Sequence, residues 1–381
     1  MSRVRAVAEL LVEAGPHWRQ YVPLRATIRN LDMNASELAL LDEIGRQVPA
    51  QFVSVDGGRE VSWVLRWMSP LGSAKFSVVE DRDPSYGLKS PLMVQSDGNQ
   101  ISILKGTDLV TTLHHSGDFS KPFLHPLNGP SGASLTWNGP PDHMHHRSLW
   151  VAHGQVNGHD LWSELPGHGV IAAVRAPEAI AGPVYSELRL DLAWQNPRGH
   201  ELLDERRVIR LWNVPDGQWI LDHASVLAAA SSDVILGDTK EGGMLCVRVA
   251  EWMEVENGGR IENSWGGINE AETWGKKANW CDYSGPMRGI WQGVAIFDHA
   301  SNPRHPTYWH VRDYGLMTAN AFGATAFGGR EDERGGMILE KGSTTAFQYR
   351  LYVHAGDART GQVPSRYLDY ACPPKVTVLA K

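Results

Sequence analysis

The most regular strand signal in the chain is Leu188-Arg189-Leu190-Asp191-Leu192-Ala193-Trp194, where apolar side chains alternate with charged ones. Successive side chains of a β-strand point to opposite faces of a sheet, so this period of two predicts a strand with one buried face. The run Ala346-Phe347-Gln348-Tyr349-Arg350-Leu351-Tyr352 alternates in the same way. The two runs therefore favour sheets over helices as the framework of the protein.

Further short strand signals surround these two runs, and turn residues separate them at fairly even spacing. This pattern is typical of a large antiparallel β-sandwich, which we place at residues 98–368. Three segments, 115–168, 256–292 and 299–336, are rich in His, Trp, Asn and Gly but look unstructured, and we predict functional loops there. The strand signals are Ile101–Leu104, Thr107–His114, Ser186–Trp194, Val208–Trp212, Trp219–Leu227, Met244–Val249, Gly293–Asp298, Met337–Glu340 and Thr345–His354.

A second group of strand signals precedes this region, and it predicts a small N-terminal β-sandwich at residues 1–90. Asn34–Ile44 is a candidate short helix or a further strand with a turn. A polar stretch with two prolines between Glu80 and Gln100 marks the domain boundary. The fold class that we predict is therefore all-β. The N-terminal signals are Val4–Val12, Tyr21–Ile28, Val61–Met68 and Ala74–Val79.

The composition is that of a globular protein, with 42% hydrophobic and 21% charged residues among 381. No run of about 18 apolar residues exists, and Glu9 and Glu13 interrupt any signal-peptide core, so we expect a cytoplasmic protein without membrane contact. The net charge of −7 comes without a basic cluster, which argues against a nucleic-acid partner. The three cysteines, Cys246, Cys281 and Cys372, lack zinc-site spacing, and we expect reduced thiols.

Nine of the sixteen histidines lie between His114 and His168. The densest stretch is Pro141-Asp142-His143-Met144-His145-His146-Arg147-Ser148-Leu149-Trp150, followed by His153 and, further on, by Glu164. Imidazole donates, accepts or binds a metal near neutral pH. In an extended segment His143 and His145 share one face, which suits either two metal-ligand nitrogens or acid–base groups directed at a polyol.

Three other segments combine charged groups with aromatic rings. The first is the turn at 237–243, with two carboxylates and a lysine before two glycines. The second, 274–285, alternates aromatic and hydrogen-bonding side chains, as many carbohydrate sites do. In the third, 298–315, Pro303 and Pro306 stiffen the chain around His305. No nucleotide-binding, HExxH, nucleophile-elbow or EF-hand motif occurs.

Over about residues 100–355, several sequence motifs resemble those of a bacterial family labelled methane oxygenase PmoA. The resemblance implies a β-sandwich in the style of aldose epimerases and polysaccharide lyases, and a link to sugar catabolism. The family label does not describe an activity here, because a methane monooxygenase subunit spans membranes. Met144 and Ser148 depart from the Pro and Gly expected in relatives. The motifs are Lys121–Pro126, Pro141–Trp150, His153–Gly158, Asp238–Gly243, Trp280–Gly285 and Asn302–Pro306.

We therefore expect a carbohydrate-active enzyme that uses histidine and carboxylate acid–base chemistry on a sugar or glycoside, by hydrolysis, elimination or epimerisation. It requires no cofactor, and no oligomeric state is predicted. Candidate catalytic residues are His143, His145, His146 and His153, with Asp142, Glu164 or Asp282 as the carboxylate. Candidate substrate-binding residues are Arg147, Asn157, Lys240, Glu241, Trp280, Tyr283, His305, Trp309 and Arg312.

Two alternatives remain open from the residues. One is a metal-dependent oxygenase or hydrolase, with a divalent ion bound by His143, His145 and His153. The other is a sugar-binding sandwich without catalysis, in which the histidines only form hydrogen bonds with the ligand.

Overall fold

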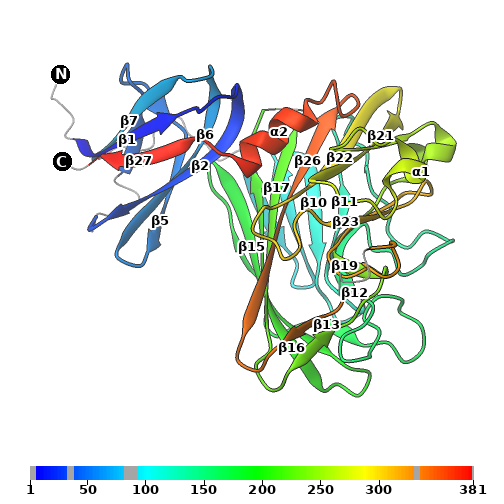
Figure 1. The fold of residues 1–381 in the computed structure, drawn as a ribbon. Coiled ribbons are helices and arrows are strands. Elements are labelled where there is room, and N and C mark those ends of the chain that lie inside the picture. The colour runs from blue at the N-terminus through cyan, green and yellow to red at the C-terminus, as the bar shows by residue number, and fades with distance from the viewer. Residues whose placement is uncertain (1–5, 32–37, 81–91, 216, 330–334, 380–381) are drawn as a thin grey trace.

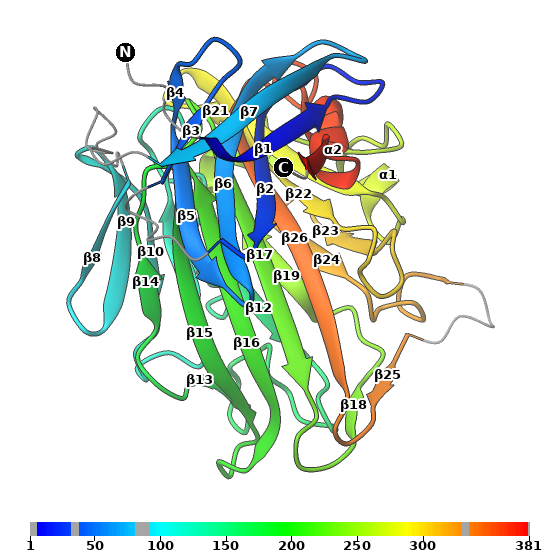
Figure 2. The ribbon, with the colours of Figure 1, turned by 90° about the vertical axis from the view of Figure 1, so that its left-hand side faces the viewer.

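A computed structural model describes residues 6–31, 38–80, 92–215, 217–329 and 335–379. The fold is all-β, as predicted, and consists of a large antiparallel sandwich with a smaller sandwich beside it (Figure 1). The large sandwich packs two sheets against each other, and the small one lies against the outer side of one of them (Figure 2). Two short α-helices occur in the described chain, α1 (Asn269–Thr273) and α2 (Val363–Ala371).

The first large sheet has eight strands. Its spatial order is β23 (Tyr308–Val311), β24 (Leu316–Asn320), β19 (Gly242–Arg248), β12 (Leu149–His153), β11 (Phe123–Leu127), β10 (Asp108–His114), β9 (Gln100–Lys105) and β8 (Leu92–Ser96).

The second large sheet has nine strands. Its order is β13 (Val170–Ala173), β15 (Tyr185–Gln195), β16 (Glu201–Trp212), β17 (Trp219–Ala228), β26 (Thr344–Ala355), β22 (Ile290–Asp298), β21 (Trp280–Met287) and β20 (Arg260–Asn263), with β14 (Glu178–Ile180) also paired to β15.

The small sandwich has a five-stranded and a three-stranded sheet. The C-terminal strand β27 returns from the large sandwich and pairs with β1, a contact that no sequence pattern indicated. The five-stranded order is β27 (Lys375–Leu379), β1 (Ala6–Glu13), β7 (Ser73–Glu80), β3 (Leu38–Leu41) and β4 (Gln47–Val48). The three-stranded order is β2 (Arg19–Arg29), β6 (Gly58–Met68) and β5 (Ala50–Val55).

Short elements complete the fold. The strands β18 (Val234–Leu236) and β25 (Met337–Leu339) pair at one end of the large sandwich, and two 3-10 turns, η2 (Glu251–Met253) and η3 (Val255–Asn257), follow β19. The candidate element at 34–44 is a strand from Leu38, and its first residues lie outside the described chain. The boundary stretch also lies mostly outside it, at 81–91.

The alternating run at 188–194 forms the centre of β15. Leu188, Leu190 and Leu192 are buried between the two large sheets, whereas Arg189 is exposed on the outer side. The same rule applies in β26, where Phe347 and Leu351 lie in the core. Burial of apolar faces supplies about 25 cal/mol per Å², so this alternation fixes which side of each strand faces inward.

The three predicted loops contain strands as well as loops. β12, β21 and β24 lie within them and are buried on nearly every side chain, since loops or the small sandwich cover their outer faces. A strand that is buried on both faces loses the alternation of polar and apolar residues. The prediction of long unstructured segments was therefore wrong for these strands.

One charged pair lies inside the core of the large sandwich. The Arg207 Nε donates to Glu205 Oε1 at 2.7 Å, and both side chains are almost fully buried. Trp194 Nε1 and Ser225 Oγ donate to the same carboxylate, at 2.8 and 2.5 Å. Burial alone would raise the pKa of Glu205, but Arg207 and these hydrogen bonds outweigh it and lower the pKa. The carboxylate is thus charged and fully satisfied.

Replacing Glu205 by Gln should destabilise the large sandwich by about 3–5 kcal/mol, because it leaves the Arg207 charge buried without a counter-ion. The double variant E205L/R207M should recover most of that loss. Urea denaturation followed by tryptophan fluorescence measures both effects. The exposed pair of Arg175 and Asp191 serves as the control, since R175M should change stability by less than about 1 kcal/mol.

Candidate functional site

The outer face of the eight-stranded sheet carries a continuous row of side chains. The strand register places Phe123, Trp150, Cys246, Thr318 and His310 opposite one another across five strands. The aromatic members, together with Trp162, form a separate apolar layer outside the main core. The segment 139–148 lies over this layer and leaves His143 and His145 partly exposed, whereas His146 is buried.

Three imidazoles of this segment pack against one another; we call residues 142–147 the histidine loop. The ring of His143 lies between those of His146 and Tyr314, with centroid distances of 4.6 and 4.8 Å and nearly parallel planes. His145 meets His146 and Trp162 edge-on, at 4.6 and 5.6 Å. His143 keeps 34% of its side chain exposed, so this clamped ring is open to solvent along one edge.

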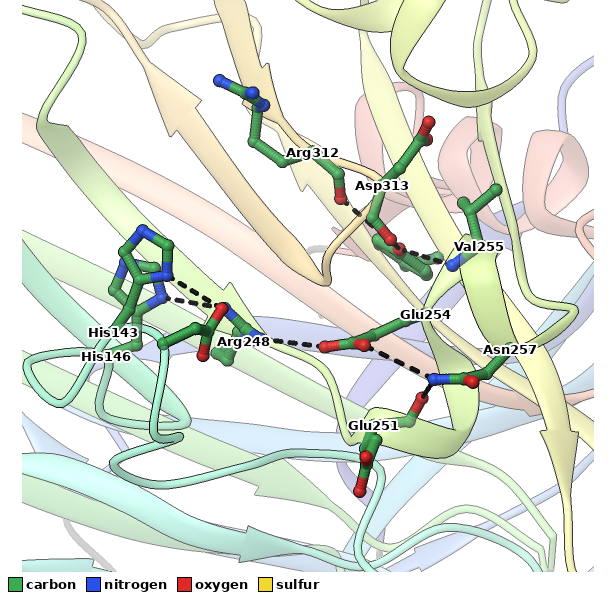
Figure 3. A network of polar contacts seen from close by, with 11 residues as sticks. His143, His146, Arg248, Glu251, Glu254, Val255, Asn257, Arg312 and Asp313 are labelled. Carbon is green, nitrogen blue, oxygen red and sulfur yellow. Dashed lines mark hydrogen bonds and ion pairs between the residues drawn. The ribbon is translucent and has the colours of Figure 1, made fainter.

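A carboxylate and a buried guanidinium fix the orientation of His143 (Figure 3). His143 Nδ1 donates to Asp142 Oδ2 at 2.9 Å, and Arg248 Nη1 donates to the same oxygen at 2.9 Å. Arg248 is only 2% exposed, and its Nη2 donates to Glu254 Oε1 at 2.8 Å. Partial burial would raise the pKa of Asp142, but the hydrogen bonds from His143 and Arg248 outweigh it and lower the pKa.

This arrangement assigns the tautomer of His143. A charged carboxylate accepts only, so Nδ1 carries the proton and Nε2 of the neutral ring is left with a lone pair. Among the described residues Nε2 has no hydrogen-bond partner. An imidazole oriented by a carboxylate, with its other nitrogen open, has the geometry of a general base.

The neighbouring imidazoles are held neutral. Partial burial, with smaller contributions from Lys121 and His143, lowers the pKa of His145 to about 4. Burial also lowers the pKa of His146, well below its usual value, and that of His310 to about 4. His310 Nδ1 donates to the Lys240 carbonyl at 2.8 Å, which leaves its buried Nε2 without a partner.

Two partly exposed ion pairs flank the histidine loop. Lys240 Nζ lies 2.7 Å from Glu241 Oε1, and Arg312 Nε lies 2.8 Å from Glu270 Oε1. Gly154 packs against the first pair: a Cβ atom at residue 154 would lie 2.9 Å from the Cβ of Glu241. Glu241 acts electrostatically on both His145 and His310, so this turn lies close to the imidazoles. Together the pairs offer both hydrogen-bond donors and acceptors to a polar ligand.

Arg147 and Glu164 meet in a clamp at the base of the loop. The Arg147 Nε donates to Glu164 Oε1 at 3.0 Å, and Lys121 Nζ donates to the same oxygen at 2.8 Å. Burial by itself would raise the pKa of Glu164, but these two cations lower it to about 2. A carboxylate that is charged and committed to two cations positions the chain, and it is a poor proton donor.

Three other predicted site residues lie apart from the histidine loop. His153 is fully buried beside Phe322, with a ring distance of 4.6 Å. Asp282 is buried on the nine-stranded sheet, where His354 Nε2 lies 2.8 Å from its Oδ1. Asn157 adopts a φ of 50° in a turn, and its Oδ1 accepts the Ile235 backbone N–H at 2.7 Å.

The remaining predicted residues also have packing or hydrogen-bonding roles. Trp280 packs on the outer face of the nine-stranded sheet, and Trp309 is in the core with Nε1 donating to the Ala278 carbonyl at 2.9 Å. His305 Nδ1 donates to buried Asp298 at 2.7 Å. The Tyr283 hydroxyl donates to the Asp313 carbonyl at 2.7 Å, so it supports the turn that carries Arg312.

The predicted metal ligands do not form a cluster. His143 and His145 have ring centroids 5.8 Å apart, while His153 is buried against Phe322. In the described part of the chain, no group of three or more His, Cys, Asp or Glu side chains could hold a metal ion.

The sequence patterns did not identify several residues of the site. Arg248 stands in the run Met244-Leu245-Cys246-Val247-Arg248-Val249, and a lone charge in a buried strand is a usable signal. Tyr314, Glu270 and Lys121 offer no such signal, because only the fold brings them to the histidine loop.

A family model matches residues 100–367, and the chain belongs to this family, described as a family of unknown function (DUF6807). The match corrects the resemblance to methane oxygenase PmoA: the matching family has no assigned function, and nothing supports that label. No curated protein matches the sequence.

Among solved structures, the chain is similar to a protein of glycosyl hydrolase family 38 from Enterococcus faecalis, with a TM-score of 0.46 and 10% identity over 98% of this chain and 47% of that one. It is similar also to an alpha-mannosidase from Enterococcus faecalis V583, with a TM-score of 0.45 and 11% identity over 98% and 46%. The chain spans less than half the length of both. No helix in the described residues is long and apolar enough to cross a membrane.

The buried histidines predict a steep loss of stability in acid. Burial lowers the pKa of His153 to about 4, against about 6.5 in an unfolded chain, so the unfolded state binds more protons between these values. Between pH 6.5 and pH 4, His153 should lower the free energy of unfolding by up to about 1.4 kcal/mol for each pH unit. H153L should flatten the profile of unfolding free energy against pH.

Denaturant titrations from pH 7.5 to 4 measure this profile. Exposed His200 provides the matched control, and H200L should leave the slope as in the unmodified protein. An unchanged slope for H153L would contradict the assignment of a neutral buried ring.

Proposed function

We propose that the protein is an enzyme that acts on a sugar or sugar-derived acid by abstracting a proton from carbon, with His143 as the base. The observation that carries this proposal is the open Nε2 of a ring whose Nδ1 is held by Asp142. The proton would pass from the substrate C–H to Nε2, and Asp142 would stabilise the imidazolium. In an epimerisation, water protonates the opposite face of the carbon and the His143 imidazolium then releases its proton to solvent. In an elimination, the leaving group departs from the adjacent carbon and takes up the proton held by the imidazolium.

The charged neighbours support this chemistry. Abstraction of a proton next to a carbonyl or carboxyl group places negative charge on oxygen, and fixed cations stabilise that charge. Lys240 and Arg312 lie on the turns beside the histidine loop. The Lys240 side chain is 44% exposed and the Arg312 side chain is 32% exposed. Their partners, Glu241 and Glu270, accept hydrogen bonds from hydroxyl groups.

Glycoside hydrolysis is less well supported by the same residues. Most glycosidases use a pair of carboxyl groups on either side of the scissile bond. Glu164 is committed to Lys121 and Arg147, and Asp282 lies on the other sheet. The carboxylate nearest the imidazoles, Asp142, is occupied by His143 and Arg248. We therefore favour elimination or epimerisation within the carbohydrate-active class.

The experiment is a turnover screen in D2O with aldoses, uronic acids and uronate-containing glycosides. We expect deuterium to enter the substrate or product at the carbon that loses its proton. H143Q and D142N should each lower kcat by about 10²–10⁴-fold, with a smaller change in KM, because they remove or misorient the base.

The matched control is H200Q, which replaces an exposed histidine far from the loop and should keep full activity. Full turnover by H143Q would contradict the proposal. Incorporation of solvent oxygen without carbon deuteration would identify hydrolysis instead. Ligand binding without any turnover, with affinity reduced in H143Q, would indicate the non-catalytic alternative.

A further inference from the structure

A groove of about 750 Å³ lies between the small sandwich and the nine-stranded sheet. One wall comes from the start of β2 and the end of β6, and the other from β20, β21 and α2. It opens on the outer face of the nine-stranded sheet, whereas the histidine loop covers the outer face of the eight-stranded sheet. The two sites are therefore separated by the thickness of the large sandwich.

Two tryptophans form the wall on the small sandwich. Trp18 and Trp67 are 64% and 67% exposed, and their ring centroids lie 6.5 Å apart with planes tilted by 30°. Most of this chain's tryptophans are largely buried, so two exposed indoles side by side are unusual here. Contiguous exposed apolar surface marks interaction sites and ligand-binding grooves, and aromatic side chains commonly line such grooves.

The backbone is strained where it presents these rings. Tyr21 follows Gln20, the β2 residue that pairs with Trp67, and has a φ of 53°, in the left-handed region that aromatic residues rarely adopt. Val22 and Leu65 continue the buried face of the β2–β6 pair on one side of this residue. Beyond it, Arg19 and Met68 are buried and Trp67 points outward. Strain of this kind persists only where the surrounding structure enforces it, and such residues cluster at ligand sites.

The opposite wall supplies polar groups. Glu262, Gln362 and Arg359 line it, and Arg359 is exposed with no carboxylate partner among the described residues. Arg366 is 7% exposed; its guanidinium pairs with Asp369 at 3.1 Å, but its buried Nε has no hydrogen-bond partner. Donors and an acceptor thus face an aromatic platform across the groove.

We propose that this groove binds an oligosaccharide, with pyranose rings on Trp18 and Trp67 and hydroxyl groups hydrogen-bonded to Glu262, Gln362 and Arg359. A pyranose has an apolar face of C–H groups and a rim of hydroxyls, which matches one aromatic wall and one polar wall. An apolar peptide or lipid would leave the charged wall without partners, at a cost for each buried polar group. The volume lies within the range of small-molecule sites, about 300–1,000 Å³.

Oligosaccharide binding in the groove does not depend on the chemistry proposed for His143. The groove would retain a sugar chain, while the histidine loop would act on its own substrate. The two proposals can therefore fail separately.

The test measures binding of neutral oligosaccharides of two to six units to the 381-residue chain, by calorimetry and by tryptophan fluorescence. We expect a fluorescence change on binding, because the indoles of the platform are solvent-exposed. W67A should weaken binding about tenfold, and W18A/W67A should abolish it, since large aromatic anchors dominate such sites. The H143Q variant should bind as the unmodified protein does.

The matched control is W252A, which removes another exposed tryptophan, 64% accessible, outside the groove. It should leave affinity within about twofold, well below the tenfold loss at a binding anchor. R359Q, which leaves the platform intact, should reduce affinity without changing the fluorescence signature. Unchanged oligosaccharide binding by W18A/W67A, or no binding by the unmodified protein, would overturn the proposal. The proposal would also be overturned if the unmodified protein self-associates and W18A/W67A is a monomer, because a second copy of the chain would then cover the two tryptophans.

Discussion

The buried guanidinium of Arg248 holds the candidate site together. It is 2% exposed, bridges Asp142 and Glu254, and lies 5.0 Å from the Tyr314 ring centre. A buried charge is tolerated only when it is paired, and removal of one partner costs several kcal/mol. Movement of the histidine loop away from β19 would remove one of the two carboxylates that pair with this buried charge, so the pairing fixes the position of Asp142. The orientation of His143 follows from it.

Burial, with a smaller contribution from this cation at His146, keeps the adjacent imidazoles neutral. His146 Nδ1 lies 3.4 Å from Arg248 Nη1, and burial together with the nearby imidazoles and this guanidinium lowers its pKa. Lys121 acts on His145 in the same direction. With these rings neutral, Asp142 is the carboxylate that can compensate a proton taken up on His143. A crowded group of histidines thereby acquires one defined acid–base pair.

The sequence predicted those parts of the fold that are half exposed. β15 and β26 alternate over much of their length because one face meets the core and the other is partly exposed to solvent. β12 and β24 are buried along their whole length, and β21 is buried along nearly all of it. Their sequences lack the strand alternation because their outward side chains also pack, against loops or the small sandwich. Likewise, β27 pairs with β1 across almost the whole length of the chain, and no local pattern encodes that contact. Period-two patterning reports exposure as much as it reports strand structure.

For the site, the sequence identified what is contiguous. The histidines at 143–146 and the ions at 240–241 are local clusters, and the strand register of β19, β24 and β23 brings them together with Arg312. It did not reveal that Asp282 belongs to the opposite sheet, because residue type alone says nothing about which face a strand presents. Between the two large sheets of the described chain, apolar side chains surround the Arg207–Glu205 pair and the buried ring of His153, and both proposed sites lie on the outer faces instead. Each of these faces is covered by a different part of the chain, and this division allows one fold to carry two separate polar surfaces.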